Sequence, residues 1–115
     1  MTVFCGADNL ALESFLMGAK GWVCVAANIF PKHMSRLFEL TCRENNIEKA
    51  RALYSELLPL LNFLEETGKF THLAKAGLEI LGRKAGPPRR PLIPADEKEK
   101  QELKHIIEKI SLVEL

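Results

Sequence analysis

The sequence predicts an α/β fold that begins with one strand–helix–strand unit and continues as helices. The two segments that resemble strands both lie within residues 2–28. Each is an apolar run without polar alternation, which is typical of a strand buried on both faces. Every later apolar pattern has the three- and four-residue spacing of a helix face.

The two strands are expected at Thr2–Cys5 and Trp22–Ala27. A helix-spaced stripe between them indicates a helix that packs back on the sheet, so the strands should be parallel. Its members are Leu12, Phe15, Leu16 and Ala19. A two-stranded parallel sheet has two open edges and cannot cover both of its faces. We therefore interpret the protein as the end of something larger.

Two helices are expected after residue 28. The first begins at Pro31, because proline is favoured in the first turn. The second runs from about Ile47 to Thr67, and Asn45-Asn46 should end the first helix and cap the second. Pro59 lies inside the second helix and should kink it, since proline removes one backbone hydrogen bond.

The last part of the chain predicts a helix over Phe70–Leu81, where Gly77 indicates close contact with another helix. Residues 86–94 contain too many prolines for a helix or a ladder and should run extended as a connector. The final helix begins at Asp96, and Glu99 three residues later resembles a capping box.

Composition excludes several classes of protein. Sixteen basic residues against 15 acidic ones leave a net charge of +1, so charge predicts neither nucleic acid nor a membrane surface as a partner. No segment resembles a signal peptide or a membrane span. The three cysteines, Cys5, Cys24 and Cys42, have no C-x-x-C spacing, so we expect buried thiols in a reducing, cytoplasmic compartment.

No metal site and no cofactor are predicted. The three histidines, His33, His72 and His105, are expected on helix surfaces without a second ligand at metal spacing. Tyr54 falls on the buried stripe of its helix, which favours a core or interface residue over an acid–base catalyst. No lysine lies inside a predicted strand, where a dry environment would activate it as a nucleophile.

Several segments together resemble the dihydrodipicolinate synthase and N-acetylneuraminate lyase family. They are Gly6-Ala7-Asp8 after an apolar strand, its spacing to Gly18-Ala19-Lys20-Gly21, the strand Trp22 to Asn28, the sequence Leu57-Leu58-Pro59-Leu60, and the proline-rich residues 86–94. The resemblance covers essentially the whole chain but only the C-terminal part of a family member.

The resemblance implies a partial (β/α)8 TIM barrel followed by a C-terminal helical region. Residues 1–45 would supply the last two strand–helix units, strands seven and eight of the barrel. Residues 46–115 would form the C-terminal helical region. In the family such helices take part in oligomer contacts, so the resemblance also implies a homo-oligomer or a missing N-terminal barrel segment as partner.

The chemistry that the resemblance implies is that of a class I aldolase. A strand-six lysine forms a Schiff base with pyruvate or a related 2-oxo acid, a strand-five tyrosine relays protons, and a Gly-Thr-Thr segment binds the carboxylate. None of these three elements is in this sequence, so no catalytic residue is assigned. A 2-oxo acid would bind only if the barrel were completed.

Four residues fall at the C-terminal ends of the two strands, where barrel enzymes place their chemistry. By resemblance, Gly6 and Val23 form a substrate-pocket wall. Asp8 and Asn28 are expected as helix caps or as the rim of that pocket. The structural alternatives are a tight turn for Gly6, a helix cap for Asp8 and plain core for Val23.

Two functional hypotheses follow. In the first, the chain is the C-terminal portion of a pyruvate-dependent Schiff-base aldolase or lyase and is inactive alone. In the second, it is a non-catalytic oligomerising or interaction protein derived from that family. Turnover after the missing strands are supplied would favour the first, and a discrete oligomer without 2-oxo acid binding would favour the second.

Overall fold

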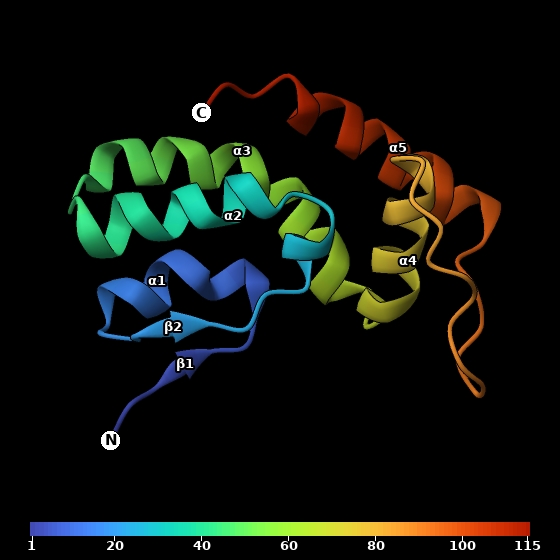
Figure 1. Ribbon diagram of the computed structural model, residues 1–115, viewed down its shortest axis with the longest axis horizontal. Coiled ribbons are helices and arrows are strands. Elements are labelled where there is room, and N and C mark those ends of the chain that lie inside the picture. The colour runs from blue at the N-terminus through green and yellow to red at the C-terminus, as the bar shows by residue number, and fades with distance from the viewer.

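The computed structural model describes all 115 residues, in which two short strands pack against a set of helices (Figure 1). Strands β1 (Phe4–Cys5) and β2 (Gly21–Trp22) pair in parallel, with Phe4 opposite Gly21 and Cys5 opposite Trp22. The parallel pairing confirms the prediction. In Figure 1 the helices lie on one side of the strand pair.

Both strands are shorter than expected. The second was expected to continue to Ala27, but it ends at Trp22. After β2 the chain leaves the extended conformation and forms the 3₁₀ turn η2 (Ala26–Asn28). The cause is the side chain of Asp8, which accepts hydrogen bonds from the backbone N–H groups of Val25 and Ala26. Those two groups are turned toward one carboxylate and cannot continue a ladder.

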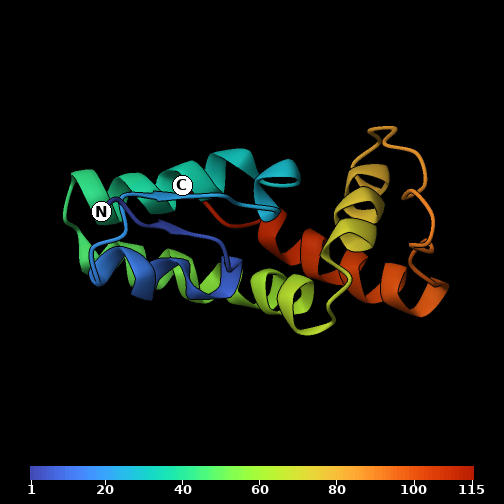
Figure 2. The same ribbon diagram turned by 90° about the horizontal axis from the view of Figure 1, so that it is seen from below.

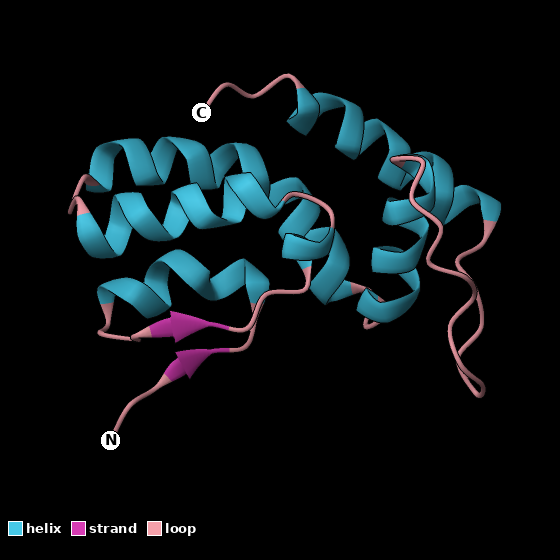
Figure 3. Ribbon diagram, in the orientation of Figure 1, coloured by secondary structure: helices cyan, strands magenta, loops and turns pink.

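Burial of the strands on both faces was also a wrong expectation for this chain. Cys5 is buried, whereas Phe4 is 59% exposed and Val23, directly after β2, is 69% exposed. Helices cover one face of the pair, and no layer covers the other (Figure 3). The side chains on both faces of a strand are buried only when another layer of structure covers each face of the sheet.

The segment between the strands consists of the 3₁₀ turn η1 (Asp8–Leu10) and helix α1 (Ala11–Leu16). Its stripe is buried at Leu12 and Phe15, but Leu16 is exposed. The Phe15 ring packs edge to face against Trp22, with centroids 5.9 Å apart, and against Phe38 at 5.4 Å. Phe15 thus joins the strand pair to the next helix.

Helix α2 (Pro31–Phe38) begins at proline as predicted and passes into a π-helical segment, η3 (Glu39–Arg43). Thr41 within that segment donates its hydroxyl to the carbonyl of Leu37 at 2.8 Å. Asn46 then caps the next helix by accepting from the N–H of Lys49 at 3.2 Å, which confirms its predicted role.

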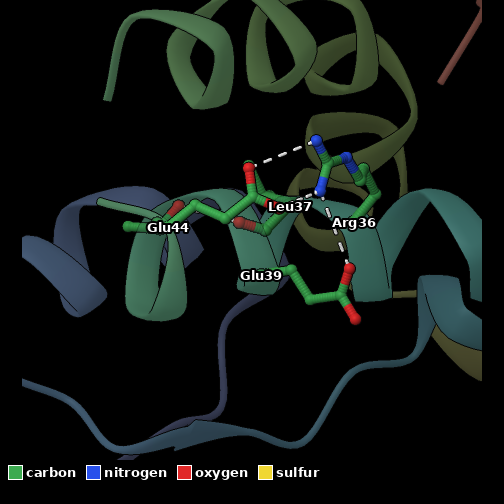
Figure 4. A network of polar contacts seen from close by, with 5 residues as sticks. Arg36, Leu37, Glu39 and Glu44 are labelled. Atoms are coloured by element: carbon green, nitrogen blue, oxygen red, sulfur yellow. Dashed lines mark hydrogen bonds and ion pairs between the residues drawn. The ribbon is translucent and has the colours of Figure 1, made fainter. Parts of the chain in front are cut away.

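An ion-pair network fixes the turn at the end of η3 (Figure 4). The guanidinium of Arg36 binds both carboxylate oxygens of Glu44, and it lies 3.7 Å from the carboxylate of Glu39. Arg36 lowers the pKa of the Glu44 carboxyl, and Glu44 raises the pKa of Arg36. Both side chains reach solvent, so the network positions the turn more than it stabilises the fold.

Helix α3 (Ile47–Glu66) is the longest element and contains Pro59. Figure 1 shows α3 changing direction in its second half, as expected for a helix that contains a proline. Its buried face provides seven core residues: Ala50, Leu53, Tyr54, Leu57, Leu60, Leu61 and Leu64. Helix α3 is therefore the element against which all the other helices pack.

Helices α4 (Phe70–Ile80) and α5 (Glu97–Ser111) pack together and are joined by the proline-rich connector. Asp96 and Glu99 form the complete capping box that the sequence predicts. A Cβ placed on Gly77 would lie 2.5 Å from Cδ1 of Ile29 and 3.6 Å from Cδ1 of Ile107 in α5. The predicted contact of Gly77 with another helix is present at α5, but the closest approach is made by Ile29, which lies between η2 and α2.

The hydrophobic core is a single cluster of 23 buried residues that runs from Cys5 to Ile110. No helix in the structure combines the length and the apolar character needed to cross a bilayer. Helix α4 lies beyond the C-terminal ends of both strands in both views (Figures 1 and 2). That end of the sheet is where the predicted site residues gather.

Candidate functional site at the C-terminal ends of the strands

Asp8 is the centre of the site, and its side chain is fully buried. Oδ1 accepts from the indole Nε1 of Trp22 at 3.0 Å and from the N–H of Val25 at 3.3 Å, and Oδ2 accepts from the N–H of Ala26 at 2.8 Å. The N-cap of its own turn is Ala7, without a side-chain cap. Asp8 therefore caps the turn after the other strand, which corrects the expected cap position.

The charge of Asp8 is set by two opposing effects. Burial raises the pKa of its carboxyl, and the hydrogen bonds from Ala26, Trp22 and Val25 lower it without cancelling that rise. The carboxylate of Glu65, on α3, accepts from the backbone N–H of Asp8 at 3.0 Å and adds a smaller upward contribution. A helix of the C-terminal half thus contacts the turn after β1 directly.

Gly6 and Val23 lie next to each other across the strand pair. The N–H of Val23 donates to the carbonyl of Cys5, the residue before Gly6, at 2.9 Å. Gly6 is exposed, and nothing lies within 4 Å of the position a Cβ would take there. Val23 is exposed as well, so the expectation of plain core for Val23 was wrong. Within this chain both residues face open space on the uncovered side.

Asn28 ends the turn after β2 and is exposed. Its side-chain amide donates to the carbonyl of Val25 at 2.9 Å, so Asn28 closes its own turn. It also lines a hollow of about 330 Å³, together with Phe70 and Lys75 of α4. The ammonium of Lys75 donates to the carbonyl of Ala85 at 3.0 Å.

The contribution of α4 to this end of the sheet was missed by the sequence reasoning. Phe70 is 43% exposed at the first position of α4, although large apolar residues on a helix are usually turned inward. The sequence pattern alone puts Phe70 on the apolar stripe of this helix and gives no signal of its exposure. That exposure depends on where α4 packs, which local patterns do not give.

A second hollow, of about 440 Å³, follows the open edge of β2. It lies between that strand and α2, and Gly21 and Trp22 form one wall while Met34 and Phe38 form another. The ring of Phe4 lies about 3.1 Å from the Cβ position of Gly21, so glycine is what leaves room for it. The groove offers apolar walls beside an unpaired strand, and the polar residues of its lining are Cys24, Ser35, Glu39 and Arg43.

Tyr54 is a buried structural residue, and the three cysteines are free thiols. Tyr54 is buried, as predicted, and its hydroxyl donates to the carbonyl of Asn9 and lies 3.0 Å from the Glu13 carboxylate. Burial and Glu13 raise the pKa of Tyr54. Burial, then the charge of Asp8, raises the pKa of Cys24, so its thiol is a poor nucleophile. Cys5 is buried, but Cys24 is half-buried and Cys42 is exposed, which corrects the expectation that all three thiols are buried.

His72 also departs from the expectation. Its ring is buried on the inner side of α4, because the stripe of that helix continues through Leu73 and Ala76 on either side of it. His105 is exposed and His33 is half-buried. No three histidine, cysteine or acidic side chains come together in a geometry that could hold a metal ion.

Comparison with known proteins gives a consistent result. Residues 1–110 match the model of the Dihydrodipicolinate synthetase family. The chain is 35% identical over 108 residues to a 4-hydroxy-tetrahydrodipicolinate synthase of Archaeoglobus fulgidus, covering 94% of this chain and 37% of that protein. It is 36% identical over 109 residues to the Methanopyrus kandleri protein of the same name, covering 94% and 35%.

Solved structures agree. The dihydrodipicolinate synthase of Thermotoga maritima superposes with a TM-score of 0.89 at 28% identity, over 97% of this chain and 37% of that one. The 4-hydroxy-tetrahydrodipicolinate synthase of Methylacidiphilum fumariolicum gives a TM-score of 0.87 at 30% identity, over 96% and 36%. The chain therefore spans little more than a third of the length of the proteins it is similar to.

Proposed function

Because the chain belongs to the dihydrodipicolinate synthetase family, we propose that it is the C-terminal portion of a pyruvate-dependent, Schiff-base aldolase or lyase. Residues 1–45 would supply the last two strand–helix units of a (β/α)8 barrel, and residues 46–115 its C-terminal helical region. The lysine and tyrosine of that chemistry would come from the missing strands, so the chain alone would be inactive.

The observation that carries the proposal is the uncovered face of the strand pair. Phe4 and Val23 point apolar side chains into solvent, and an apolar groove runs along the edge of β2. Covering such apolar surface stabilises the protein by about 25 cal/mol per Å². Further barrel strands would meet this need. They would add as parallel neighbours at the open edges of the pair, and the closed barrel would enclose its uncovered face.

The site residues take defined places in this proposal. Gly6 and Val23, which neighbour each other at the C-terminal end of the strand pair, would form the wall of the 2-oxo acid pocket. Asp8 would hold that wall in place from behind through Trp22 and Ala26. Asn28 would stand at the rim.

Reconstitution tests the proposal. The N-terminal part of the Archaeoglobus fulgidus relative, up to its region of similarity with this chain, is co-expressed with the chain carrying an affinity tag. We expect a 1:1 complex in which borohydride with pyruvate labels a lysine of the N-terminal part, because borohydride reduces a Schiff base to a stable amine. A matched chain with Val23→Lys should give no complex. Absence of both complex and labelling with the wild-type chain would overturn the proposal.

The alternative function, a non-catalytic oligomerising protein, uses the same exposed surface differently. Two copies could cover Phe4 and Val23 against each other without any added strand. Sedimentation of the purified chain separates the two readings. A discrete oligomer that the N-terminal part does not dissociate would favour the alternative, whereas exchange into the mixed complex favours the barrel.

A further inference from the structure

A third hollow, of about 220 Å³, lies away from the strand ends, between α4, the proline-rich connector and the first turns of α5. Pro87, Pro88 and Pro94 form its wall on the connector side. Proline rings fix the backbone and leave few conformations for the wall to adopt, so this hollow is pre-formed.

One residue of the lining carries an unsatisfied polar atom. This residue, His72, is 8% exposed, and its Nδ1 is buried without a hydrogen-bond partner in the chain. Buried polar atoms are almost always paired, and an exception calls for a partner from outside. The other such imidazole, His33, packs edge to face on Phe30 instead, with ring centroids 5.1 Å apart.

Two lysines line the same hollow. Lys75 from α4 and Lys100 from α5 line it, and neither has a carboxylate within ion-pair distance. Lys75 donates one hydrogen bond to the carbonyl of Ala85, which holds its chain in place and leaves two further protons. Glu79 is the one acidic residue of the lining, and it is exposed, so it can turn to solvent.

From this arrangement we infer that the hollow between α4, α5 and the connector binds a small oxygen anion, a phosphate or a dicarboxylate. His72 and Lys75 on α4 and Lys100 on α5 provide three donors from two helices, and prolines close the remaining side. Such an anion would join α4 to α5 and to the connector. This site uses none of the residues assigned to the 2-oxo acid pocket, so it stands or falls independently of the proposed function.

Nuclear magnetic resonance of the 115-residue chain, with labelled histidine rings, tests the inference. The chain is titrated with inorganic phosphate and, separately, with succinate, at constant pH and at an ionic strength held constant with potassium chloride. We expect a saturable shift of the His72 ring signals, while those of His33 and His105 stay unchanged. The probe with the lower Kd identifies whether a phosphoryl group or a pair of carboxylates is preferred.

Surface variants make the test specific. Lys100→Gln should weaken binding about 10-fold or more, the usual loss for one charge-assisted hydrogen bond. Lys98→Gln, two residues away on α5 and outside the lining, should leave Kd unchanged, and Glu79→Gln should lower it. Because the lysine variants leave the core intact, they do not depend on replacing buried His72. A shift that does not saturate, or one that Lys100→Gln leaves unchanged, would overturn the inference.

Discussion

The indole N–H of Trp22 donates to the carboxylate of Asp8 across 3.0 Å, and this bond joins the second strand to the turn after the first. The same carboxylate accepts from two backbone N–H groups, so one buried side chain sets the end of β2. Replacing Asp8 by asparagine turns an amide donor toward other donors, and we expect the free energy of unfolding to fall by about 2 kcal/mol. Urea denaturation followed by circular dichroism measures it.

Trp22→Phe is the matched comparison for Asp8→Asn, since it removes one donor and keeps an apolar ring. Its cost should be nearer to 1 kcal/mol. An Asp8→Asn protein as stable as the wild type would contradict the role of the carboxylate as the common acceptor.

The pH dependence of stability follows from the same carboxyl. Burial raises its pKa above the ordinary value of 3.8, so the folded chain holds the proton more tightly than the unfolded chain. The free energy of unfolding should therefore fall as pH rises from about 4 through the pKa of folded Asp8. The difference between the wild type and Asp8→Asn isolates this effect, and it should shrink over that range. A difference that grows with pH would show that the three hydrogen bonds outweigh burial.

Gly77→Ala tests the close packing of α4. Its new methyl group would meet Ile29, which is buried and cannot move aside freely, so we expect a loss of about 1–3 kcal/mol. Gly6→Ala is the control, because open space surrounds that position, and it should be neutral for the isolated chain. In the reconstituted barrel, the same Gly6→Ala change should raise the pyruvate KM if Gly6 forms the pocket wall. Equal losses of stability for Gly77→Ala and Gly6→Ala would contradict the conclusion that Gly77 is tightly packed and Gly6 is not.

Tyr54→Phe separates a structural tyrosine from a catalytic one. The variant removes the hydroxyl contacts with Asn9 and Glu13, and we expect a loss of about 1–2 kcal/mol. Borohydride labelling of the reconstituted barrel should be unchanged, because the hydroxyl faces α1 and not the open side of the sheet. Loss of labelling without loss of stability would reassign Tyr54 to the chemistry.

Val23→Lys tests the uncovered face. A lysine there places a charge where the proposed strands would cover Val23, so it should block complex formation and raise the solubility of the chain alone. Leu112→Lys is the control, since Leu112 is 84% exposed at the far end of α5. Chromatography with light scattering measures both. Equal effects of the two variants would place the contact surface elsewhere.

Local sequence patterns were sufficient for the helices. The predicted range Ile47–Thr67 differs from α3 by one residue, and the caps at Asn46 and Asp96 follow from side chains that bond three residues away. The parallel strands followed from the helix between them. For the helices and their caps the deciding contact lies close by in the sequence.

The end of β2 and the position of His72 were not predictable in that way. Val25 and Ala26 give their N–H groups to Asp8, 17 and 18 residues earlier, and nothing near them in the sequence announces that bond. The inner side of α4 depends likewise on where Ile29 and Ile107 come to lie. Asp8 and Asn28 were both predicted as residues of this region. Asn28 bonds Val25, three residues earlier, whereas the partners of Asp8 depend on the tertiary structure.

The hydrogen bond from the Asp8 amide to Glu65 spans 57 residues and ties α3 to the first turn of the chain. A cut between residues 45 and 46 would therefore not give two independent folding units. The hydrophobic core contains residues from both halves, so each half would lose core contacts that the other half supplies. Exchange of that one amide hydrogen with deuterium reports whether the two halves are docked. In a mixture with added barrel strands, slower exchange of the Asp8 amide would show that assembly stabilises the contact between the two halves.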